Sequence, residues 1–361
     1  MTEASHVLPR TVITGLPGYV AGRRALALST AALASNESHE PPLPGVVEAI
    51  GAQAARANRY PDMGATALRE AIATHAGVDV DMVAVGPGSV AVLQQAIAAL
   101  CDAGDEVVFA WRSFEAYPIL TAIAGAEAVR VPLLPDESHD LPAMAAAVTD
   151  RTKVVLLCSP NNPTGVRLAT AEVEQFLAAV PSHVLVVLDE AYGEYTPDPS
   201  GTASIALLAR HPNLCLLRTL SKAYGLAGLR VGYALARPDL AEALRRTAIP
   251  FGVSSVAQAA GIAALAATDV VRQRAARVVS ERERVLAALR SAGWTTPDSA
   301  ANFVWLRAGD ALLQELMEAF DAADILVRGY AGDGVRITLA DPATNDRVLA
   351  VLAERAGFGA Q

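Results

Sequence analysis

The sequence predicts an α/β fold built on a mainly parallel seven-stranded sheet that lies between helices. Three observations predict it. Short apolar runs rich in Val and Leu alternate with longer segments of helical periodicity between residues 82 and 236. These runs are apolar on both faces, which is typical of strands covered by helices on both sides. Polar residues of complementary kinds follow directly after four of the runs.

The seven expected strands can be taken in chain order. They read MVAVG (82–86), EVVFA (106–110), AVRVPL (128–133), KVVLLCS (153–159), VLVVLD (184–189), LCLLRT (214–219) and VGYALA (231–236). Between the first two, the segment 89–104 has the spacing of a helix that begins at Ser89 and ends toward Gly104. Strands that alternate with helices in this way predict parallel pairing.

The chain is expected to divide into three parts. A Pro- and Gly-containing arm over 1–44 contributes to the smaller domain, and the large domain spans 45–252. The remaining part, 253–361, is predicted to be a smaller α+β domain. It begins with a long helix over 266–292, followed by strands at NFVWLR (302–307), ILVRGY (325–330) and VRITLA (335–340).

Charge and composition exclude several classes of function. The 29 basic and 38 acidic residues give a net charge of −9 without a basic cluster, which argues against nucleic-acid binding. The sequence shows neither a signal-peptide pattern nor an apolar run long enough to span a membrane. Three scattered cysteines form neither a disulfide framework nor a metal motif, so no metal is expected. These features predict a cytoplasmic protein that acts on small molecules.

The chemically interesting residues follow the strands. Ligands of open α/β sheets bind beyond the carboxyl ends of the strands, so residues at these exits should converge. The exits carry helix-terminal amides, an amide side chain, a carboxylate with a phenol, and hydroxyls with an amine. The residues concerned are Gly88 and Ser89, Asn162, Asp189 and Tyr192, and Thr219, Ser221 and Lys222.

Taken one at a time, most of these features have an ordinary structural interpretation. A turn explains Gly88 and Ser89, and Lys222 could lie on the surface. Arg336 alternates with apolar neighbours, and a solvated edge-strand arginine is its ordinary interpretation. The same holds for His139 as a solvated loop histidine. Asp189 is harder to explain, because a carboxylate after five apolar residues is costly unless it is paired.

Together, the segments resemble the fold-type I pyridoxal-phosphate enzymes, specifically the histidinol-phosphate aminotransferase subfamily. The resemblance covers nearly the whole chain. It rests on ASNES (34–38), NRYPD (58–62), GPGS (86–89), NNPTG (161–165), DEAY (189–192), SKAYGLAGLRVGY (221–233), ANFVW (301–305) and VRIT (335–338). The segment AWRSFEAYP (110–118) is most similar to the actinobacterial aromatic (phenylalanine) aminotransferase branch of the subfamily.

The resemblance implies pyridoxal 5′-phosphate as cofactor and assigns residues to its ring. Lys222 matches the lysine that forms the Schiff base and transfers the proton. Asp189 matches the carboxylate that pairs with the pyridine nitrogen, which makes the ring an electron sink. Asn162 and Tyr192 match the hydrogen-bond partners of the ring 3-oxygen, and Phe114 matches an aromatic residue stacked on the ring.

The resemblance also assigns the phosphate and substrate contacts. Arg336 matches the arginine that holds the substrate α-carboxylate, with Asn162 beside it, and Arg328 and Tyr19 match positions near the substrate side chain. Tyr60 matches a tyrosine that reaches the phosphate from the neighbouring subunit, so a homodimer with shared active sites is implied. The other phosphate ligands implied are Gly88, Ser89, Thr219, Ser221 and Arg230.

The implied reaction is ping-pong transamination between an aromatic L-amino acid, preferably phenylalanine, and 2-oxoglutarate. Trp111, Phe114 and Tyr117 could form a slot for the aromatic ring. A phosphate site built from Tyr19, Arg112 and Arg328 would instead favour histidinol phosphate, which remains the alternative donor. A pyridoxal-phosphate decarboxylase and a binding protein that keeps the fold without turnover are further alternatives.

Overall fold

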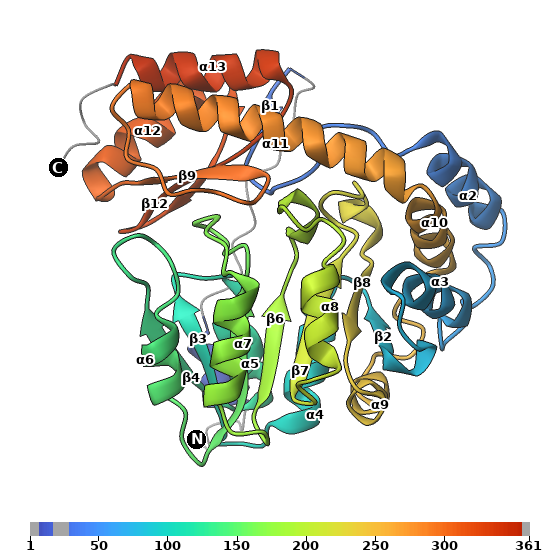
Figure 1. Cartoon of the computed structure of the whole chain (residues 1–361). Helices are drawn as coiled ribbons and strands as arrows, with labels where there is room; N and C mark the ends of the chain where they lie inside the picture. The colour runs from blue at the N-terminus through green and yellow to red at the C-terminus, as the bar shows by residue number, and fades with distance from the viewer. Residues whose placement is uncertain (1–6, 17–28, 356–361) are drawn as a thin grey trace, which may run out of the picture.

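A seven-stranded sheet forms the centre of the larger part of the protein (Figure 1). The computed structural model describes residues 7–16 and 29–355. The sheet order is β2-β8-β7-β6-β5-β3-β4, and only β8 is antiparallel to its neighbours. The strands are β2 Val83–Gly86, β3 Glu106–Trp111, β4 Glu127–Pro132, β5 Thr152–Cys158, β6 Leu185–Asp189, β7 Leu214–Thr219 and β8 Gly232–Leu235. All seven predicted strands are therefore confirmed, with their mainly parallel pairing.

Helices cover both faces of this sheet because its strands are apolar on both sides. In β6, Leu185 and Val187 pack on one face, and Val186 and Leu188 pack on the other. The first face is covered by α4 Ser89–Leu100, α5 Ala116–Ala124 and α9 Pro238–Arg246. The second is covered by α3 Thr66–Ala76, α6 Leu141–Ala146, α7 Thr170–Ala179, α8 Thr202–Leu208 and α10 Ser255–Ala266. The helix α2 Pro44–Ala54 packs on the outside of α10. In Figure 1, α7 and α8 lie in front of the sheet.

A smaller three-stranded antiparallel sheet lies beyond the carboxyl edge of the large one. Its order is β11-β12-β9, with β9 Phe303–Arg307, β11 Arg328–Tyr330 and β12 Gly334–Thr338. The helices α12 Asp310–Ala322 and α13 Pro342–Ala353 pack on it around a separate apolar core. The long predicted helix is confirmed as α11 Thr268–Ser291, which extends from the smaller part, below α13, toward α10 in Figure 1.

The predicted strand ILVRGY is wrong in one respect, because it changes partners in the middle. Its first half, β10 Ile325–Leu326, pairs in parallel with β1 Ala31–Ala32 of the arm. Its second half, β11, pairs with β12. Val327 between them is buried in the small core, and this anchors the change of partner. The arm thus completes the smaller part, as the sequence predicts for 1–44, while the boundary at 252/253 stays a prediction.

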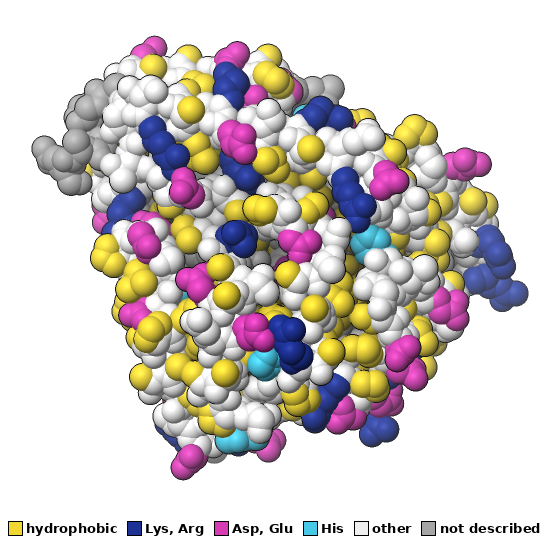
Figure 2. Space-filling model, in the orientation of Figure 1, with side chains coloured by type: hydrophobic (Ala, Val, Ile, Leu, Met, Phe, Trp, Pro, Cys, Tyr) yellow, Lys and Arg dark blue, Asp and Glu magenta, His cyan; other side chains and the backbone are white. Residues whose placement is uncertain are grey.

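The remaining elements are short, and the surface is mixed in charge. They are α1 Thr11–Thr14 and the 3₁₀ turns η1 Val80–Met82, η2 Gly193–Tyr195 and η3 Ala227–Leu229. Within residues 7–16 and 29–355, none of the helices combines the length and apolarity needed to cross a bilayer. On the face drawn in Figure 2, basic and acidic side chains are interspersed rather than gathered by sign.

Candidate active site

A cavity of about 620 Å³ lies where the strand exits of the large sheet meet the smaller part. It is on the sheet face covered by α4 and α5, because Cys158, Asp189 and Thr219 end their strands on that face. The predicted site residues that line the cavity are Ser89, Phe114, Asn162, Asp189, Tyr192, Thr219, Ser221, Lys222, Arg230, Arg328 and Arg336. The structure therefore brings together residues that lie far apart in the sequence, from Ser89 to Arg336.

Asp189 is a buried carboxylate held by two donors. The Tyr117 hydroxyl donates to Oδ2 at 2.8 Å, and the Ala191 amide donates to Oδ1 at 3.2 Å. Burial raises the pKa of Asp189 to about 6, and the bond from Tyr117 opposes that rise. Tyr117 is itself fully buried, so its predicted place in a substrate ring slot is wrong. Its role as the partner of Asp189 had no signal in the sequence other than its aromatic character.

Lys222 projects into the cavity as a half-buried amine. Its Nζ donates to the Ser35 carbonyl at 3.1 Å and lies 5.8 Å from the centre of the Tyr192 ring. Burial lowers the pKa of Lys222 to about 7, and Arg336 is the nearby charge that lowers it most. Arg230, the cationic neighbour expected from the sequence, contributes less. The amine is thus poised between its neutral and charged forms near neutral pH.

The N-terminus of α4 forms an anion cradle with Ser221 and Arg230. The Arg230 guanidinium donates to Ser221 Oγ at 3.0 Å, and Thr219 Oγ1 donates to the same oxygen at 3.0 Å. A Cβ added at Gly88 would collide with this guanidinium, so the Arg230 side chain packs directly against the backbone of Gly88. Hydroxyls, a guanidinium and the free amides of a helix N-terminus are the donors that bind a phosphate.

Arg336 is buried, so its interpretation as a solvated edge arginine is wrong. It extends from β12 into the cavity, where Nη1 donates to Asn162 Oδ1 and Nη2 donates to the Ala34 carbonyl at 2.6 Å. It is only 6% exposed, and it has no carboxylate partner among the described residues. A buried guanidinium that faces a cavity is suited to bind a carboxylate through both nitrogens.

Asn36 is a site residue that the sequence suggested only as part of the ASNES motif. Its Nδ2 donates to Tyr192 Oη at 2.8 Å. Thr338 fixes both ends of Asn36, since it accepts from the Asn36 amide at 3.0 Å and donates to Oδ1 at 2.9 Å. Asn36 has a φ of 54°, a conformation that asparagine tolerates better than most residues. The arm therefore orients the Tyr192 hydroxyl toward the cavity.

The two arginines that could have formed a second phosphate site are both paired. Arg328 Nη2 lies 2.8 and 3.0 Å from the two carboxylate oxygens of Glu115. Arg112 pairs with Asp333, its Nε donating at 2.7 Å. The guanidinium groups of Arg112 and Arg130 lie 4.5 and 4.6 Å from the centre of the Trp111 ring. Trp111 does not line the cavity, so its predicted place in the ring slot is wrong. Phe114 does line it, beside Ile119 and Leu120 of α5.

Two predicted contacts are not part of the cavity within one chain. Tyr60 is 83% exposed, packs its ring 4.7 Å from the Phe251 ring, and does not line the cavity of its own chain. Its action on a neighbouring subunit stays a prediction. Tyr19 lies outside the described residues.

The expectation of a solvated His139 is wrong. The side chain is 5% exposed beneath the segment that carries Asn161, and burial lowers the pKa of its ring to about 4. The ring is therefore neutral at physiological pH.

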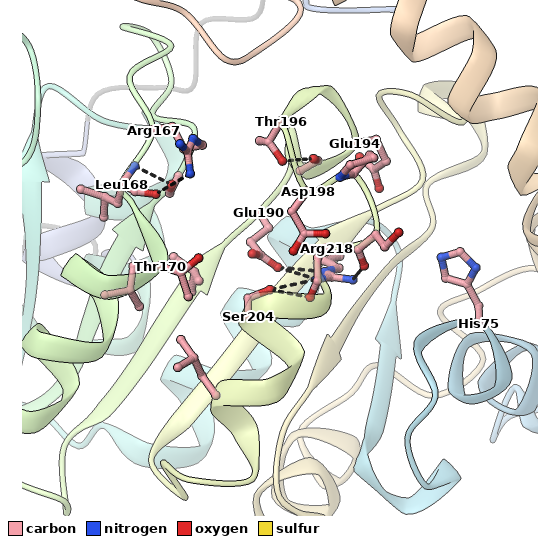
Figure 3. Close-up of a pocket in the computed structure, with 18 residues that line it drawn as sticks. His75, Arg167, Leu168, Thr170, Glu190, Glu194, Thr196, Asp198, Ser204 and Arg218 are labelled. Atoms are coloured by element: carbon pink, nitrogen blue, oxygen red, sulfur yellow. Dashed lines mark hydrogen bonds and ion pairs between the residues drawn. The ribbon is translucent and has the colours of Figure 1, made fainter.

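A second, smaller cavity of about 60 Å³ lies on the other face of the sheet (Figure 3). Figure 3 shows Glu190 and Ser204 pointing toward Arg218, which bonds Glu190 at 2.8–2.9 Å and Ser204 Oγ at 3.2 Å. Glu194 lines the same cavity, and burial raises its pKa to about 7. Because Glu190 and Arg218 come from the same strand ends as Asp189 and Thr219 but point the other way, this cluster is separate from the site.

Comparison with known proteins agrees with this geometry. The family model for aminotransferase class I and II matches residues 27–352. Proteins described as aromatic amino acid aminotransferases are 50% identical in Streptomyces avermitilis, over 97% of this chain and 98% of the relative, and 52% identical in Streptomyces coelicolor, over 98% and 99%. A crystal structure of histidinol-phosphate aminotransferase from Sinorhizobium meliloti in complex with pyridoxal-5′-phosphate superimposes with a TM-score of 0.87. It is 31% identical and covers 97% of this chain and 98% of that one.

The cavity contains a poised lysine, a buried carboxylate and an anion cradle in the fold that these proteins share. The family model spans most of the chain, and relatives at half identity match it from end to end. The chain therefore belongs to the class I and II aminotransferases, with their fold-type I architecture.

Proposed function

We propose that this aminotransferase transfers an amino group between an aromatic L-amino acid, preferably phenylalanine, and 2-oxoglutarate in ping-pong order. Its cofactor is pyridoxal 5′-phosphate, as in the family to which it belongs. The bound cofactor supplies an electron sink that stabilises negative charge at the substrate Cα. The residues present fit this group, because the cradle at Gly88 and Arg230 suits its phosphate and Asp189 suits a protonated ring nitrogen.

The proposed role of each residue follows from where it lies. Lys222 attaches the cofactor and moves the proton at Cα, for which an amine with a pKa of about 7 is well suited. Asp189 holds the proton on the ring nitrogen while Tyr117 holds Asp189 in place. Asn162 and Tyr192 contact the ring oxygen, and the remaining contacts come from Ser89, Phe114, Thr219, Ser221 and Arg230.

The substrate end of the cavity favours an aromatic donor. Arg336 is the cation placed to bind the α-carboxylate, and Phe114, Ile119 and Leu120 offer an apolar wall. The observation that carries the proposal is that Arg328 is already neutralised by Glu115, so the wall lacks an uncompensated cation for a phosphate dianion at this position. Relatives named as aromatic amino acid aminotransferases support the same preference.

A donor comparison tests this proposal. We expect kcat/KM for phenylalanine with 2-oxoglutarate to exceed that for histidinol phosphate at a fixed ionic strength. A buried polar site strongly rejects a substrate that leaves its polar groups unpaired, whereas an apolar slot discriminates only weakly. A true phosphate site should therefore show a large ratio of kcat/KM in favour of histidinol phosphate. If histidinol phosphate is the better donor by about a hundredfold or more, the enzyme acts on histidinol phosphate instead.

The cellular and quaternary setting of this function remains a prediction. We expect a cytoplasmic location from the three scattered cysteines, which are all free in the structure. A homodimer with shared active sites rests on the resemblance and on the exposure of Tyr60.

A further inference from the structure

We infer that Glu115 sets the charge preference of the substrate cavity: by pairing with Arg328 it disfavours substrates whose side chain ends in an anion. The inference rests on the proposed aromatic transamination and names the residue that enforces it. Glu115 acts through Arg328, and it is therefore a specificity determinant and not a catalytic group.

The pair lies across the cavity between the two parts of the protein. Glu115 immediately precedes α5 and stands between Phe114 and Ala116, which both line the cavity. Arg328 begins β11 of the smaller sheet. The Glu115 side chain is 28% exposed and the Arg328 side chain is 12% exposed, so both are largely withdrawn from water. The Arg328 guanidinium also lies 5.4 Å from the centre of the Tyr330 ring, which limits how far it can turn away.

The Glu115 carboxylate is directed to Arg328 and to no helix amide. Residues at the start of a helix commonly accept a bond from the first backbone amides, but Glu115 makes no such capping bond. Both of its oxygens instead contact the same nitrogen, Arg328 Nη2. The carboxylate is therefore not needed to cap α5, and its contact in the cavity is with the arginine.

The charge arrangement follows from this contact. Among the residues that the structure describes, Arg336 at one end of the cavity has no carboxylate partner, whereas Arg328 is neutralised by Glu115. A substrate with a distal phosphate or carboxylate would have to displace Glu115 from Arg328 and then lie beside that carboxylate. Like charges held together in a poorly solvated site repel strongly. A neutral phenyl ring meets no such opposition.

The same pair should also affect the amino acceptor. The 2-oxoglutarate that we propose as acceptor carries a distal carboxylate, so Glu115 should raise its KM. An acceptor with a neutral side chain, such as 4-hydroxyphenylpyruvate, should not be affected in this way. The acceptor series is therefore a second measure of the same charge preference.

The test compares phenylalanine with 4-carboxyphenylalanine, which differ only by an anionic group on the ring. In the holoenzyme, Glu115→Gln should raise kcat/KM for 4-carboxyphenylalanine relative to phenylalanine by about tenfold or more, and lower the KM for 2-oxoglutarate. Binding without turnover should change likewise: the Kd ratio of 3-(4-carboxyphenyl)propionate to 3-phenylpropionate should fall by a similar factor. Asp333→Asn is the matched control, because it breaks the Arg112 pair that does not line the cavity. It should leave both ratios unchanged.

A second variant tests the pair from the other side. Arg328→Gln leaves the Glu115 carboxylate without its cation, so discrimination against 4-carboxyphenylalanine should become stronger than in the wild type. Ratios that stay the same in both Glu115→Gln and Arg328→Gln would overturn the inference, and so would an equal effect in Asp333→Asn. The proposed function fails separately, if the wild-type enzyme itself prefers histidinol phosphate to phenylalanine.

Discussion

Lys222 is subject to opposing demands, because the fold buries an amine that must also exchange protons. Its pKa of about 7 results from burial and from Arg336, while the Ser35 carbonyl gives the amine a hydrogen-bond acceptor. At Asp189, a single buried hydroxyl has a similar effect. The Tyr117 hydroxyl donates to the Asp189 carboxylate, 72 positions away in the sequence, and holds it in place. At this scale, the chemistry depends on what each charged group touches.

We predict that Lys222→Met stabilises the cofactor-free protein in a pH-dependent way. A lysine whose pKa falls from 10.5 to about 7 on folding binds fewer protons in the folded than in the unfolded state between these values. The unfavourable contribution of Lys222 is therefore complete below pH 7 and is lost as the pH rises toward 10.5. The variant should be more stable than the wild type at pH 7, by an amount that shrinks toward pH 10.

Urea unfolding of both proteins at several pH values measures this difference. The same variant should have no transaminase activity, because methionine can neither attach the cofactor nor transfer a proton. A stability difference that does not change between pH 7 and pH 10, or normal turnover by the variant, would contradict the assignment.

At the scale of elements, the site depends on how closely α4 approaches β8 and the loop that carries Arg230. Gly88 has a φ of +85°, and a Cβ at Gly232 would collide with the Ser89 backbone. Both glycines therefore allow a helix N-terminus to lie against its neighbours. This close approach places the helix amides and the guanidinium around one anion.

We predict that Gly88→Ala lowers both the affinity for the cofactor and the stability of the protein. Gly104→Ala is the control, because Gly104 has a similar φ of +89° but an added Cβ there would meet no atom within 4 Å. Both variants should lose about 1–3 kcal/mol of stability, because a positive φ strains any residue that carries a Cβ. Only Gly88→Ala displaces Arg230, so its Kd for pyridoxal 5′-phosphate should rise by about tenfold or more. Equal cofactor affinities in the two variants would show that the collision with Arg230 is unimportant.

At the scale of the whole molecule, the active site lies between two folded parts that the arm connects. Arg336 reaches from the smaller sheet to Asn162, and Asn36 of the arm holds Tyr192 of the large part. On the outside, the exposed Tyr60 and Phe251 rings pack together, and Ile249 beside them is 66% exposed. Exposed apolar side chains close together are typical of an interface between proteins.

We predict that two inactive variants, Tyr60→Ala and Lys222→Ala, regain transaminase activity when their subunits are mixed. If Tyr60 acts on the neighbouring subunit, a hybrid of Tyr60→Ala and Lys222→Ala chains contains one site with both residues intact. Mixed under conditions of subunit exchange, the variants should recover about a quarter of the wild-type activity, since half of the dimers are hybrids with one intact site. Sedimentation should show a dimer. Full activity in a monomer at low concentration would refute the shared site.

The sequence by itself determined the layered architecture and the neighbourhood of the site. Each of the seven strands was predictable because a run of apolar residues and the helix that follows it are local patterns. The convergence of Asn162, Asp189, Thr219 and Lys222 followed from parallel strands ending at one edge. A run of adjacent residues is enough to specify such features, since the periodicity of side chains is built into the backbone geometry.

Only the tertiary structure decided which of these side chains are buried and how their charges are paired. Pattern alone placed Arg336 in solvent, yet the arm and Asn162 cover it. Nothing in the local sequence separates Phe114, which faces the cavity, from Tyr117, which bonds Asp189. Arg328 meets Glu115 across 213 positions, a contact that exists only once the smaller sheet lies against α5. Burial and ion pairing are properties of segments brought together from far apart, and they are absent from the pattern of any one segment.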